Sequence, residues 1–238
     1  MNRWYPVARS EELVARHIAQ AQLLGQEIAL WRDDAGAVNA WENRCPHRGV
    51  RLSIGCNTGA ELRCRYHGFR FAGGSGQCTF IPAHPSQRPA SSLRTGVYAA
   101  AERYHYVWVS LDPRTDAPPD LPMPGDAAAT TLRSIFVEAP AAALADHLLR
   151  GYRIDAATDA SVTEGGPFTL TAAENGRHAP VVLFLLQPVT ATQTVMHGLL
   201  RPAAAAADRL AVLRHHNSQM TALRDAVEGI CGAAKRAS

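Results

Sequence analysis

Two short stretches each place a cysteine close to a histidine, and this arrangement constrains the chain more than any other feature. The stretches read NRCPHRGV and RCRYHGFR. Written as a spacing, they give Cys45-x-His47, sixteen intervening residues, and Cys64-x-x-His67. Cysteine sulfur and histidine nitrogen are common ligands of zinc and of iron–sulfur clusters. The sequence therefore predicts a metal centre that these four residues bind.

A glycine follows each pair, and the flanking sequence bears on which metal the pairs would hold. Gly49 and Gly68 would let the backbone approach an inorganic cluster and donate N–H groups to its sulfurs. A structural zinc site accepts the same donors and stays an alternative. Zinc fingers, however, place one pair on a helix, whereas both pairs here lie between predicted strands. The flanks therefore favour a cluster.

The motif resembles that of the Rieske family, in which C-x-H is followed after sixteen or seventeen residues by C-x-x-H. The sequences CPHRG and CRYHG also resemble those found in Rieske-type oxygenases. The resemblance implies a [2Fe-2S] cluster with Cys45 and Cys64 on one iron and His47 and His67 on the other. Two neutral imidazoles in place of two thiolates make such a cluster easier to reduce than an all-cysteine cluster.

The resemblance also indicates a branch of the family. Rieske proteins of respiratory complexes carry two further cysteines that form a disulfide beside the cluster, and the matching positions here are Val50 and Tyr66. No such bridge is expected, and Cys56 and Cys78 are predicted to be ordinary thiols. The chain therefore resembles the oxygenase branch, which a soluble reductase or ferredoxin reduces.

The first half of the chain carries the pattern of a small antiparallel β domain. Short β-like runs recur in QEIALWR, AVNAWEN, ELRCRYHGFRF and GVYAAAERYHYVWVSL, with glycine-rich breaks between them. A short helix is expected after the serine cap Ser10. Its apolar residues recur at helical spacing: Leu13, Val14, His17 and Ile18. We predict a Rieske domain over residues 1–113 and a proline-rich linker over residues 114–130.

Residues 131–238 have a different pattern, which makes the predicted fold class α+β. PAAALADHLLRGY reads as a helix, and PFTLTAAE, APVVLFLLQPV and TQTVMHGLLR read as strands. A long closing helix is expected in DRLAVLRHHNSQMTALRDAVEGICGAA, with six residues on one apolar face: Leu210, Leu213, Met220, Leu223, Val227 and Ile230. The resemblance implies a shortened helix-grip-like oxygenase domain, a sheet with a long C-terminal helix.

In the family this second domain holds a mononuclear ferrous iron on two histidines and a carboxylate. The histidines lie in a D-x-x-H-x-x-x-x-H segment, and the best match is DHLLRGYRIDAAT. There the aspartate becomes Arg150 and the histidines become Arg153 and Thr158. The residue matching the family's carboxylate is Met220, which we expect to be a core methionine.

Arginine at these positions opposes metal binding as well as failing to supply a ligand. Its guanidinium has no acceptor lone pair. A divalent ion ~4 Å from one guanidinium would meet a repulsion of roughly 8 kcal/mol at an effective dielectric constant of about 20. The resemblance therefore implies that the mononuclear iron site is lost.

Other residues could rebuild an iron site under a shifted alignment. The candidates are Asp146, His147, Asp155, Asp159, His178, His197, His215 and His216. His147 beside Asp146 is the strongest of them. His215 and His216 are adjacent and have no histidine at i+4, so we expect both to face solvent. The second domain, about 110 residues, is also shorter than the catalytic domains of the family.

Charge and hydropathy exclude several classes of protein. The 24 basic and 21 acidic residues give a net charge of +3 without a run of five like charges, which does not favour nucleic acid or an anionic membrane. No window approaches 18 consecutive apolar residues, and the first residues lack the apolar core of a signal peptide. We expect a cytoplasmic protein in which the five cysteines serve as ligands or thiols.

Three hypotheses about function follow. In the first, the chain is a Rieske electron-transfer subunit without catalytic residues of its own. It would carry electrons from an NAD(P)H-dependent reductase or ferredoxin to an iron-bearing oxygenase subunit, in a trimer-like homo- or hetero-oligomer. In the second, it is an active compact Rieske monooxygenase or demethylase with unorthodox iron ligands. In the third, the cluster serves redox sensing or a scaffold role.

Overall fold

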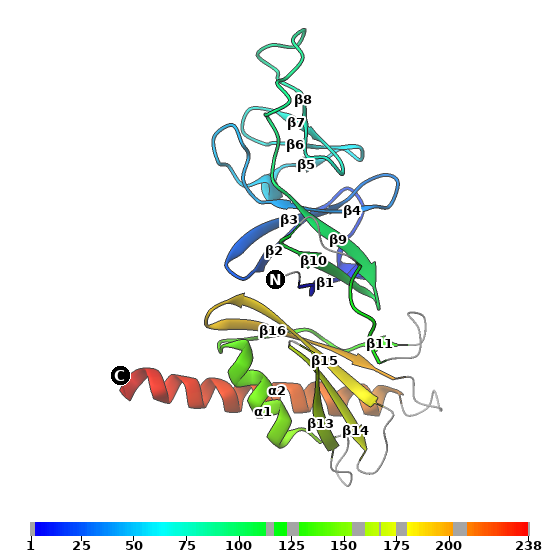
Figure 1. Ribbon diagram of the computed structural model, residues 1–238, viewed down its shortest axis with the longest axis vertical. Coiled ribbons are helices and arrows are strands. Elements are labelled where there is room, and N and C mark those ends of the chain that lie inside the picture. Colours follow the sequence, from blue (N-terminus) through cyan, green and yellow to red (C-terminus); the bar gives the residue numbers. More distant parts are fainter. Residues whose placement is uncertain are drawn as a thin grey trace. The chain divides into compact units, whose positions relative to one another are not determined.

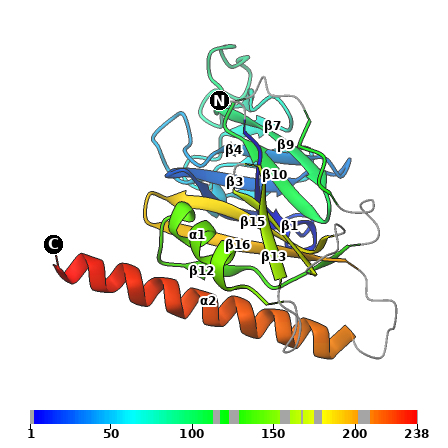
Figure 2. The same cartoon turned by 60° about the horizontal axis from the view of Figure 1, so that its bottom comes forward.

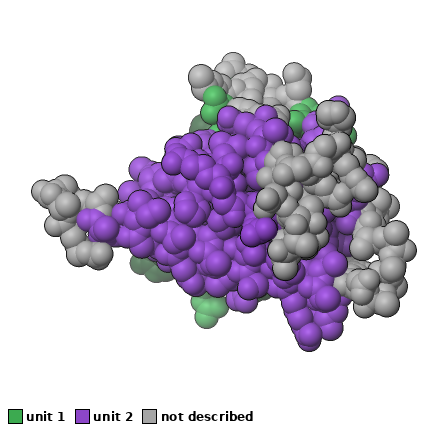
Figure 3. Space-filling model, turned by 90° about the horizontal axis from the view of Figure 1, so that it is seen from below, with its two compact units in different colours: residues 1–119 green, residues 120–238 purple. Residues whose placement is uncertain are grey.

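The chain divides into two compact units, Met1–Pro119 and Asp120–Ser238, which Figure 3 colours separately. The computed structural model describes residues 3–112, 117–122, 129–153, 160–166, 168–174, 180–201 and 209–237. The division falls within the stretch predicted as a linker. Because residues 113–116 and 123–128 lie outside the described residues, the linker over 114–130 stays a prediction.

The first unit is built on a six-stranded antiparallel sheet (Figure 1). In sheet order its strands are β1 (Tyr5–Arg9), β10 (Tyr106–Ser110), β9 (Val97–Arg103), β4 (Val38–Glu42), β3 (Gln26–Arg32) and β2 (Ile18–Leu23). Two-residue turns join β2 to β3 and β9 to β10. The prediction of strands in QEIALWR, AVNAWEN and GVYAAAERYHYVWVSL is confirmed.

The helix predicted after Ser10 is wrong. Ser10–Glu12 form a single 3-10 turn, η1, and Ile18 begins strand β2. β2 pairs with β3 along its whole length, from Ile18 opposite Trp31 to Leu23 opposite Gln26. Val14 is exposed, so the apolar residues at helical spacing do not share a buried face. Pairing with β3 therefore decides the structure of this segment over local propensity.

A smaller four-stranded sheet carries the second cysteine–histidine stretch, and the first lies between β4 of the large sheet and this smaller sheet. Its strands are β5 (Cys56–Asn57), β6 (Glu61–Arg63), β7 (Arg70–Ala72) and β8 (Cys78–Phe80), with a second 3-10 turn, η2, at Leu52–Ile54. One buried cluster joins this sheet to the large one. Trp31 and Trp41 of the large sheet meet edge to face with ring centroids 5.0 Å apart, and Leu62 and Phe71 of the small sheet pack in the same cluster.

The second unit is a sheet with two helices (Figures 1 and 2). The strands, in sheet order, are β11 (Thr130–Thr131), β16 (Gln193–Leu200), β15 (Pro180–Thr190), β14 (Thr169–Glu174) and β13 (Ala160–Gly166), and β12 (Ile135–Val137) also pairs with β16. The helices are α1 (Ala141–Gly151) and α2 (Arg209–Ala237). The predicted α+β class is confirmed, although β11, β12 and β13 were not predicted.

One face of β15 packs against both helices and forms the core of this unit. Val182, Phe184 and Leu186 alternate along β15 and lie in one cluster with Leu144 of α1 and Met220 of α2. The prediction that Met220 is a core residue is therefore confirmed. None of the helices among the described residues is long and apolar enough to cross a membrane.

The predicted apolar face of α2 is only partly buried. Leu223 and Val227 are buried with Met220, whereas Leu210 and Ile230 are exposed. The 29 residues of α2 make a helix about 43 Å long. Its middle packs in the core of the unit, and Figure 2 shows the C-terminal part of α2 extending past the sheet. Leu210 and Ile230 therefore lie outside the buried part of the predicted face.

An ion pair bridges two non-adjacent strands of the large sheet. The Arg32 guanidinium on β3 donates to both carboxylate oxygens of Glu102 on β9, at 2.5 and 2.6 Å, across the intervening strand β4. The hydrogen bonds from Arg32 hold the pKa of Glu102 below its usual range. A carboxyl group with a lowered pKa stabilises the fold above its unfolded pKa, and this contribution is lost as the pH falls through the folded pKa.

We predict that Glu102→Gln lowers the free energy of unfolding by about 1 kcal/mol at pH 7, the upper range for a partly exposed pair. The loss should shrink as the pH falls below about 4, because wild-type Glu102 becomes protonated as well. Urea unfolding followed by tryptophan fluorescence measures this in the first unit, where all four tryptophans lie. A difference that does not change with pH would contradict the assignment.

Candidate metal centre

The two cysteine–histidine stretches fold into loops with the same backbone hydrogen bonds. In the first, the amide of Cys45 donates to the carbonyl of Val50 at 2.8 Å, and the amide of Gly49 donates back to Cys45 at 2.8 Å. In the second loop the amide of Cys64 donates to the carbonyl of Phe69 at 2.8 Å, and the amide of Gly68 donates to the carbonyl of Cys64 at 3.1 Å. Each loop therefore turns back within five residues and carries its cysteine at the start.

The glycine of each loop has a conformation that favours glycine. Gly49 has φ +69° and Gly68 has φ +70°, both in the left-handed region. The fourth residue after each cysteine thus reverses the chain and allows the amide to return to the cysteine carbonyl. This is the structural reason for the repeated Cys-x-x-x-Gly spacing in the sequence.

The loops present their four predicted ligands in two pairs. Cys45 and Cys64 are 4% and 3% exposed, whereas His47 and His67 are exposed. The Nδ1 atoms of the two imidazoles face each other at 3.1 Å. A buried pair of sulfurs and an exposed pair of nitrogens therefore lie at one end of the small sheet.

Backbone amides surround the Cys45 sulfur. The N–H groups of His47 and Arg48 donate hydrogen bonds to it, and Cys64 lies within hydrogen-bonding reach of it. The pKa of the Cys45 thiol is raised to about 11, first by burial and also by Cys64, while the two amides act in the opposite direction. A bound metal deprotonates such a thiol outright, and amides that donate to the sulfur then stabilise the thiolate.

The donor set fits a two-iron cluster better than a single zinc. Two ligand atoms of one metal ion, each about 2.0–2.1 Å from it, lie about 3.0–3.4 Å apart, which matches the two facing imidazole nitrogens. A zinc ion would need all four ligands around one point. Within the described ranges, however, no three histidine, cysteine, aspartate or glutamate side chains are grouped closely enough for one ion.

Aromatic rings orient the two histidines. The Phe69 ring stacks on His47 with centroids 4.4 Å apart and planes within 14°, and the Tyr66 ring lies 3.8 Å from that of His67. Phe69 is buried and Tyr66 is 59% exposed. Each imidazole therefore has one face covered by a residue of the second loop, while its edge stays open to solvent.

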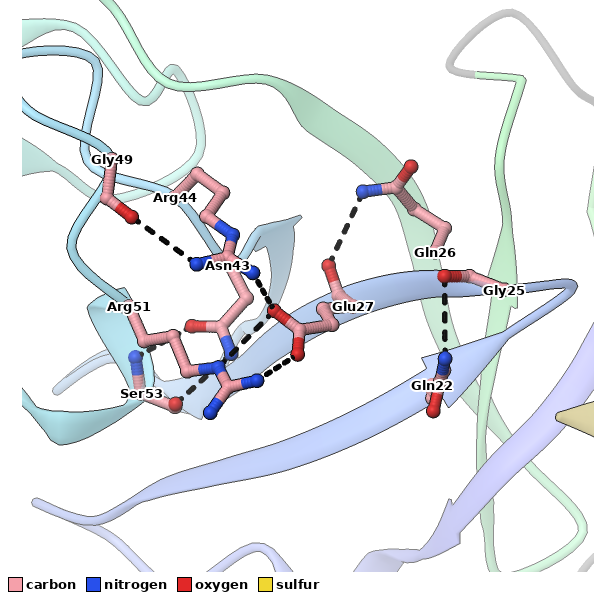
Figure 4. A network of polar contacts seen from close by, with 9 residues as sticks. All are labelled: Gln22, Gly25, Gln26, Glu27, Asn43, Arg44, Gly49, Arg51 and Ser53. Carbon is pink, nitrogen blue, oxygen red and sulfur yellow. Dashed lines mark hydrogen bonds and ion pairs between the residues drawn. The ribbon is translucent and has the colours of Figure 1, made fainter. Parts of the chain in front are cut away.

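A carboxylate on β3 connects both ends of the first loop (Figure 4). Arg44, which precedes Cys45, reaches Glu27 at 2.8 Å, and Arg51, which follows Val50, donates to the same carboxylate. Arg44 also donates to the carbonyl of Gly49 at 3.3 Å. The hydrogen bond from Arg51 is the largest cause that lowers the pKa of Glu27. One ionised side chain thus links the start and the end of the loop to the large sheet.

A buried amide supports the same loop. Asn43 is fully buried, and its side chain exchanges two hydrogen bonds with Ser53, donating at 3.0 Å to the hydroxyl and accepting at 2.7 Å from the amide (Figure 4). Sequence reasoning did not predict the roles of Asn43 and Glu27. The arginines on either side of CPHRGV were a signal, but their partner Glu27 lies on another strand.

The structure describes three of the four positions predicted to have lost the second metal site. The side chain of Arg150 is 79% exposed and approaches Asp146 one turn away at 4.0 Å. Arg153 is also exposed, whereas Met220 is fully buried. Thr158 lies outside the described residues, as do Asp155, Asp159 and His178.

The prediction that His215 and His216 face solvent is wrong for His216. This residue is buried, and its Nδ1 is hydrogen bonded to the hydroxyl of Tyr152, whose pKa is raised by burial. His216 lies one turn before Met220 on α2, so it points to the core, where Tyr152 supplies a polar partner. His197 is buried too, between Ser134 at 2.8 Å and Gln187 at 2.9 Å. Both buried histidines thus have hydrogen-bonding side chains around them.

Comparison with known proteins decides what the two loops belong to. The family described as "Rieske [2Fe-2S] domain" matches residues 3–98. Residues 3–98 are a Rieske [2Fe-2S] domain. The prediction of a Rieske-type chain is confirmed.

Curated relatives resemble the chain over about half of its length. "Oxidoreductase NdmD" of Pseudomonas putida is 52% identical over 111 residues, which are 47% of this chain and 19% of that protein. "Toluene-4-sulfonate monooxygenase system iron-sulfur subunit TsaM1" of Comamonas testosteroni is 37% identical over 119 residues, 50% of this chain and 33% of that protein. The chain thus spans a third or less of the length of these two relatives.

Solved structures resemble the chain over both units. Dicamba monooxygenase bound to dicamba matches with a TM-score of 0.76 and 25% identity, over 96% of this chain and 86% of that one. NdmA of Pseudomonas putida CBB5 matches with a TM-score of 0.75 and 19% identity, over 95% of this chain and 81% of that one. The chain therefore joins a Rieske domain to a second unit with the fold found in Rieske oxygenases.

The two loop glycines provide a matched pair of substitutions, because their φ angles agree and their surroundings differ. A Cβ at Gly49 would meet nothing within 4 Å, whereas a Cβ at Gly68 would lie 3.0 Å from Cγ of Pro82. We predict that Gly49→Ala costs about 1 kcal/mol of backbone strain. Gly68→Ala should cost the same strain plus the contact with Pro82, and should lose the cluster at a lower temperature. Visible absorbance during heating measures this loss, and equal midpoints for the two variants would contradict the loop assignment.

Proposed function

We propose that this chain is a one-electron carrier of a Rieske oxygenase system. It would accept electrons from an NAD(P)H-dependent reductase or a ferredoxin and pass them to an iron-bearing oxygenase partner. The observation that carries the proposal is the pairing of two buried cysteines with two exposed histidines on loops of one Rieske domain. When bound, a cluster with this ligand set takes up and releases one electron at a higher potential than an all-cysteine cluster.

The residues of this chain have separate tasks in that role. Cys45 and Cys64 would hold one iron away from solvent, and the amides of His47 and Arg48 would stabilise the Cys45 thiolate. His47 and His67 would hold the other iron and present their ring edges to a partner. Phe69 and Tyr66 keep the imidazoles in place, so little rearrangement of the ligands would accompany electron transfer.

The second unit supports a carrier without a catalytic iron of its own. A ferrous site for oxygen chemistry needs two histidines and a carboxylate with open positions. Arg150 and Arg153 are exposed at the positions that match the family's bridging aspartate and first histidine, and Met220 lies in the core. Sequence similarity to the curated relatives is also confined to about half of the chain. We propose that this unit serves assembly with the iron-bearing partner, in a trimer-like oligomer in the cytoplasm.

A second candidate is an active compact monooxygenase or demethylase. The likeness to dicamba monooxygenase over 96% of the chain favours it. It requires a third iron per chain, bound by residues such as Asp146 and His147 of α1 together with others from a shifted alignment. The two candidates therefore differ in metal content.

Iron and acid-labile sulfide per anaerobically purified chain distinguish the two candidates. We expect two irons and two sulfides, and Cys64→Ser should contain neither. A mononuclear iron in the second unit would give three irons to two sulfides and would leave one iron without sulfide in Cys64→Ser. That result would overturn the carrier proposal, and the Cys64→Ser variant makes it visible even when cluster loading is incomplete.

A further inference from the structure

We infer that the surface around His47 and His67 docks an acidic one-electron carrier protein through Arg48, Arg63 and Arg65. This inference rests on the proposed function, since it names the kind of partner that exchanges electrons at the exposed histidine edge. It adds the residues that recognise the partner and the sign of the charge that the partner presents. We call these three arginines with Tyr66 the arginine surface.

Basic charge is concentrated in the segment that carries the two loops. Residues 43–70 contain six arginines and a single acidic residue, Glu61, a net charge of +5. The whole chain has a net charge of +3, so the remaining residues together have a net charge of −2. The positive charge of this protein is therefore a local property of the two loops and their flanks.

Half of these arginines already contact acidic side chains of the domain. Arg44 and Arg51 share the carboxylate of Glu27, and Arg70 lies 3.9 Å from Glu61 and over the ring of Phe80. Their charges stabilise the first loop and the small sheet. They are therefore poor candidates for binding a partner.

The other three arginines are exposed. Arg48, Arg63 and Arg65 form no ion pair with any residue in the described part of the chain. Long cationic side chains without internal partners gain most from an external carboxylate, because no existing ion pair has to be broken.

These arginines flank the histidine edge on both loops. Arg48 follows His47 in the first loop, and Arg65 precedes His67 by two residues in the second. Arg63 and Arg65 line an open cavity of about 460 Å³ that also touches Cys64. A partner seated on the cavity would therefore contact the loop that carries one predicted ligand of each kind.

The composition of the surface suits a protein partner. Tyr66, 59% exposed between Arg65 and His67, adds aromatic area, and tyrosine and arginine are enriched at protein interfaces. A long polyanion such as nucleic acid would extend past the two loops onto surface without excess positive charge. A compact acidic protein matches the limited extent of the charge and would be steered to the histidine edge before contact.

Small oxidants of opposite charge test the sign of the field without any assumed partner. The dithionite-reduced protein is mixed with ferricyanide or with tris(1,10-phenanthroline)cobalt(III), and cluster absorbance is followed in a stopped-flow instrument. Each oxidant takes one electron from the cluster, iron(III) becoming iron(II) or cobalt(III) becoming cobalt(II), and no bond or proton is exchanged. The measured quantity is the rate constant with ferricyanide divided by the rate constant with the cobalt complex. At low salt we expect this ratio to be about fivefold lower in the Arg48→Gln/Arg65→Gln double variant than in wild type. At about 1 M salt the two proteins should have the same ratio. Arg214→Gln, an exposed arginine of α2, is the matched control and should leave the ratio unchanged.

An acidic plant-type ferredoxin tests the docking itself. Its dissociation constant, measured by calorimetry at low salt, should weaken about tenfold in the double variant and stay unchanged in Arg214→Gln. The inference would be overturned if wild type and the double variant bound the ferredoxin with equal affinity. It would also be overturned if millimolar phosphate inhibited the ferricyanide reaction while the double variant bound the ferredoxin as wild type does. Both results leave the electron-carrier proposal intact, whereas a cluster that neither oxidant can oxidise would overturn that proposal instead.

Discussion

The metal centre depends on a backbone hydrogen bond that is made twice. In each loop a cysteine amide donates to the carbonyl five residues later, and a glycine with positive φ closes the turn. This pair of turns buries both sulfurs and leaves both imidazoles exposed. The asymmetry would let one domain protect an iron–sulfur cluster and still exchange electrons with a partner, since the buried and exposed edges belong to different ligands.

The surrounding interactions serve these two loops. Glu27 connects the arginines on either side of the first loop to β3, and Asn43 with Ser53 ties the loop entrance to η2. Trp31 and Trp41 join the large sheet to the small one beneath the cysteines. The first unit is therefore a rigid support for one exposed edge, and charged residues near that edge are free to be used for recognition.

The second unit has the fold found in the solved structures of NdmA and dicamba monooxygenase. The position next to Arg153 is Tyr152, which is buried against Phe184 and hydrogen bonded to His216 of α2. Tyr152 and His216 thus join the two helices inside the core. This packing joins α1, α2 and the sheet of the second unit in one core.

The sequence was most informative where a residue type has few structural uses. Cysteine and histidine at fixed spacing, each followed by glycine, predicted the loops, and alternating apolar residues predicted β3 and β15. It was least informative where a distant partner decides the outcome. Ile18 begins a strand that pairs with β3, although it recurs at helical spacing with Leu13, Val14 and His17. His216 is buried with Tyr152, which directly follows α1 and is far away in the sequence, as its hydrogen-bonding partner. The ion pairs of Glu27 with the first loop were not predicted for the same reason, because Glu27 lies 18 residues before Cys45.

The most direct measurement of the central claim is pulsed electron paramagnetic resonance of the reduced protein, with histidine labelled by ¹⁵N at Nδ1. The facing Nδ1 atoms of His47 and His67 predict strong couplings from two ¹⁵N nuclei, and from one nucleus in His47→Cys. A reduced cluster without strong ¹⁵N coupling, or with couplings unaffected by His47→Cys, would contradict the assignment of these loops as the metal centre.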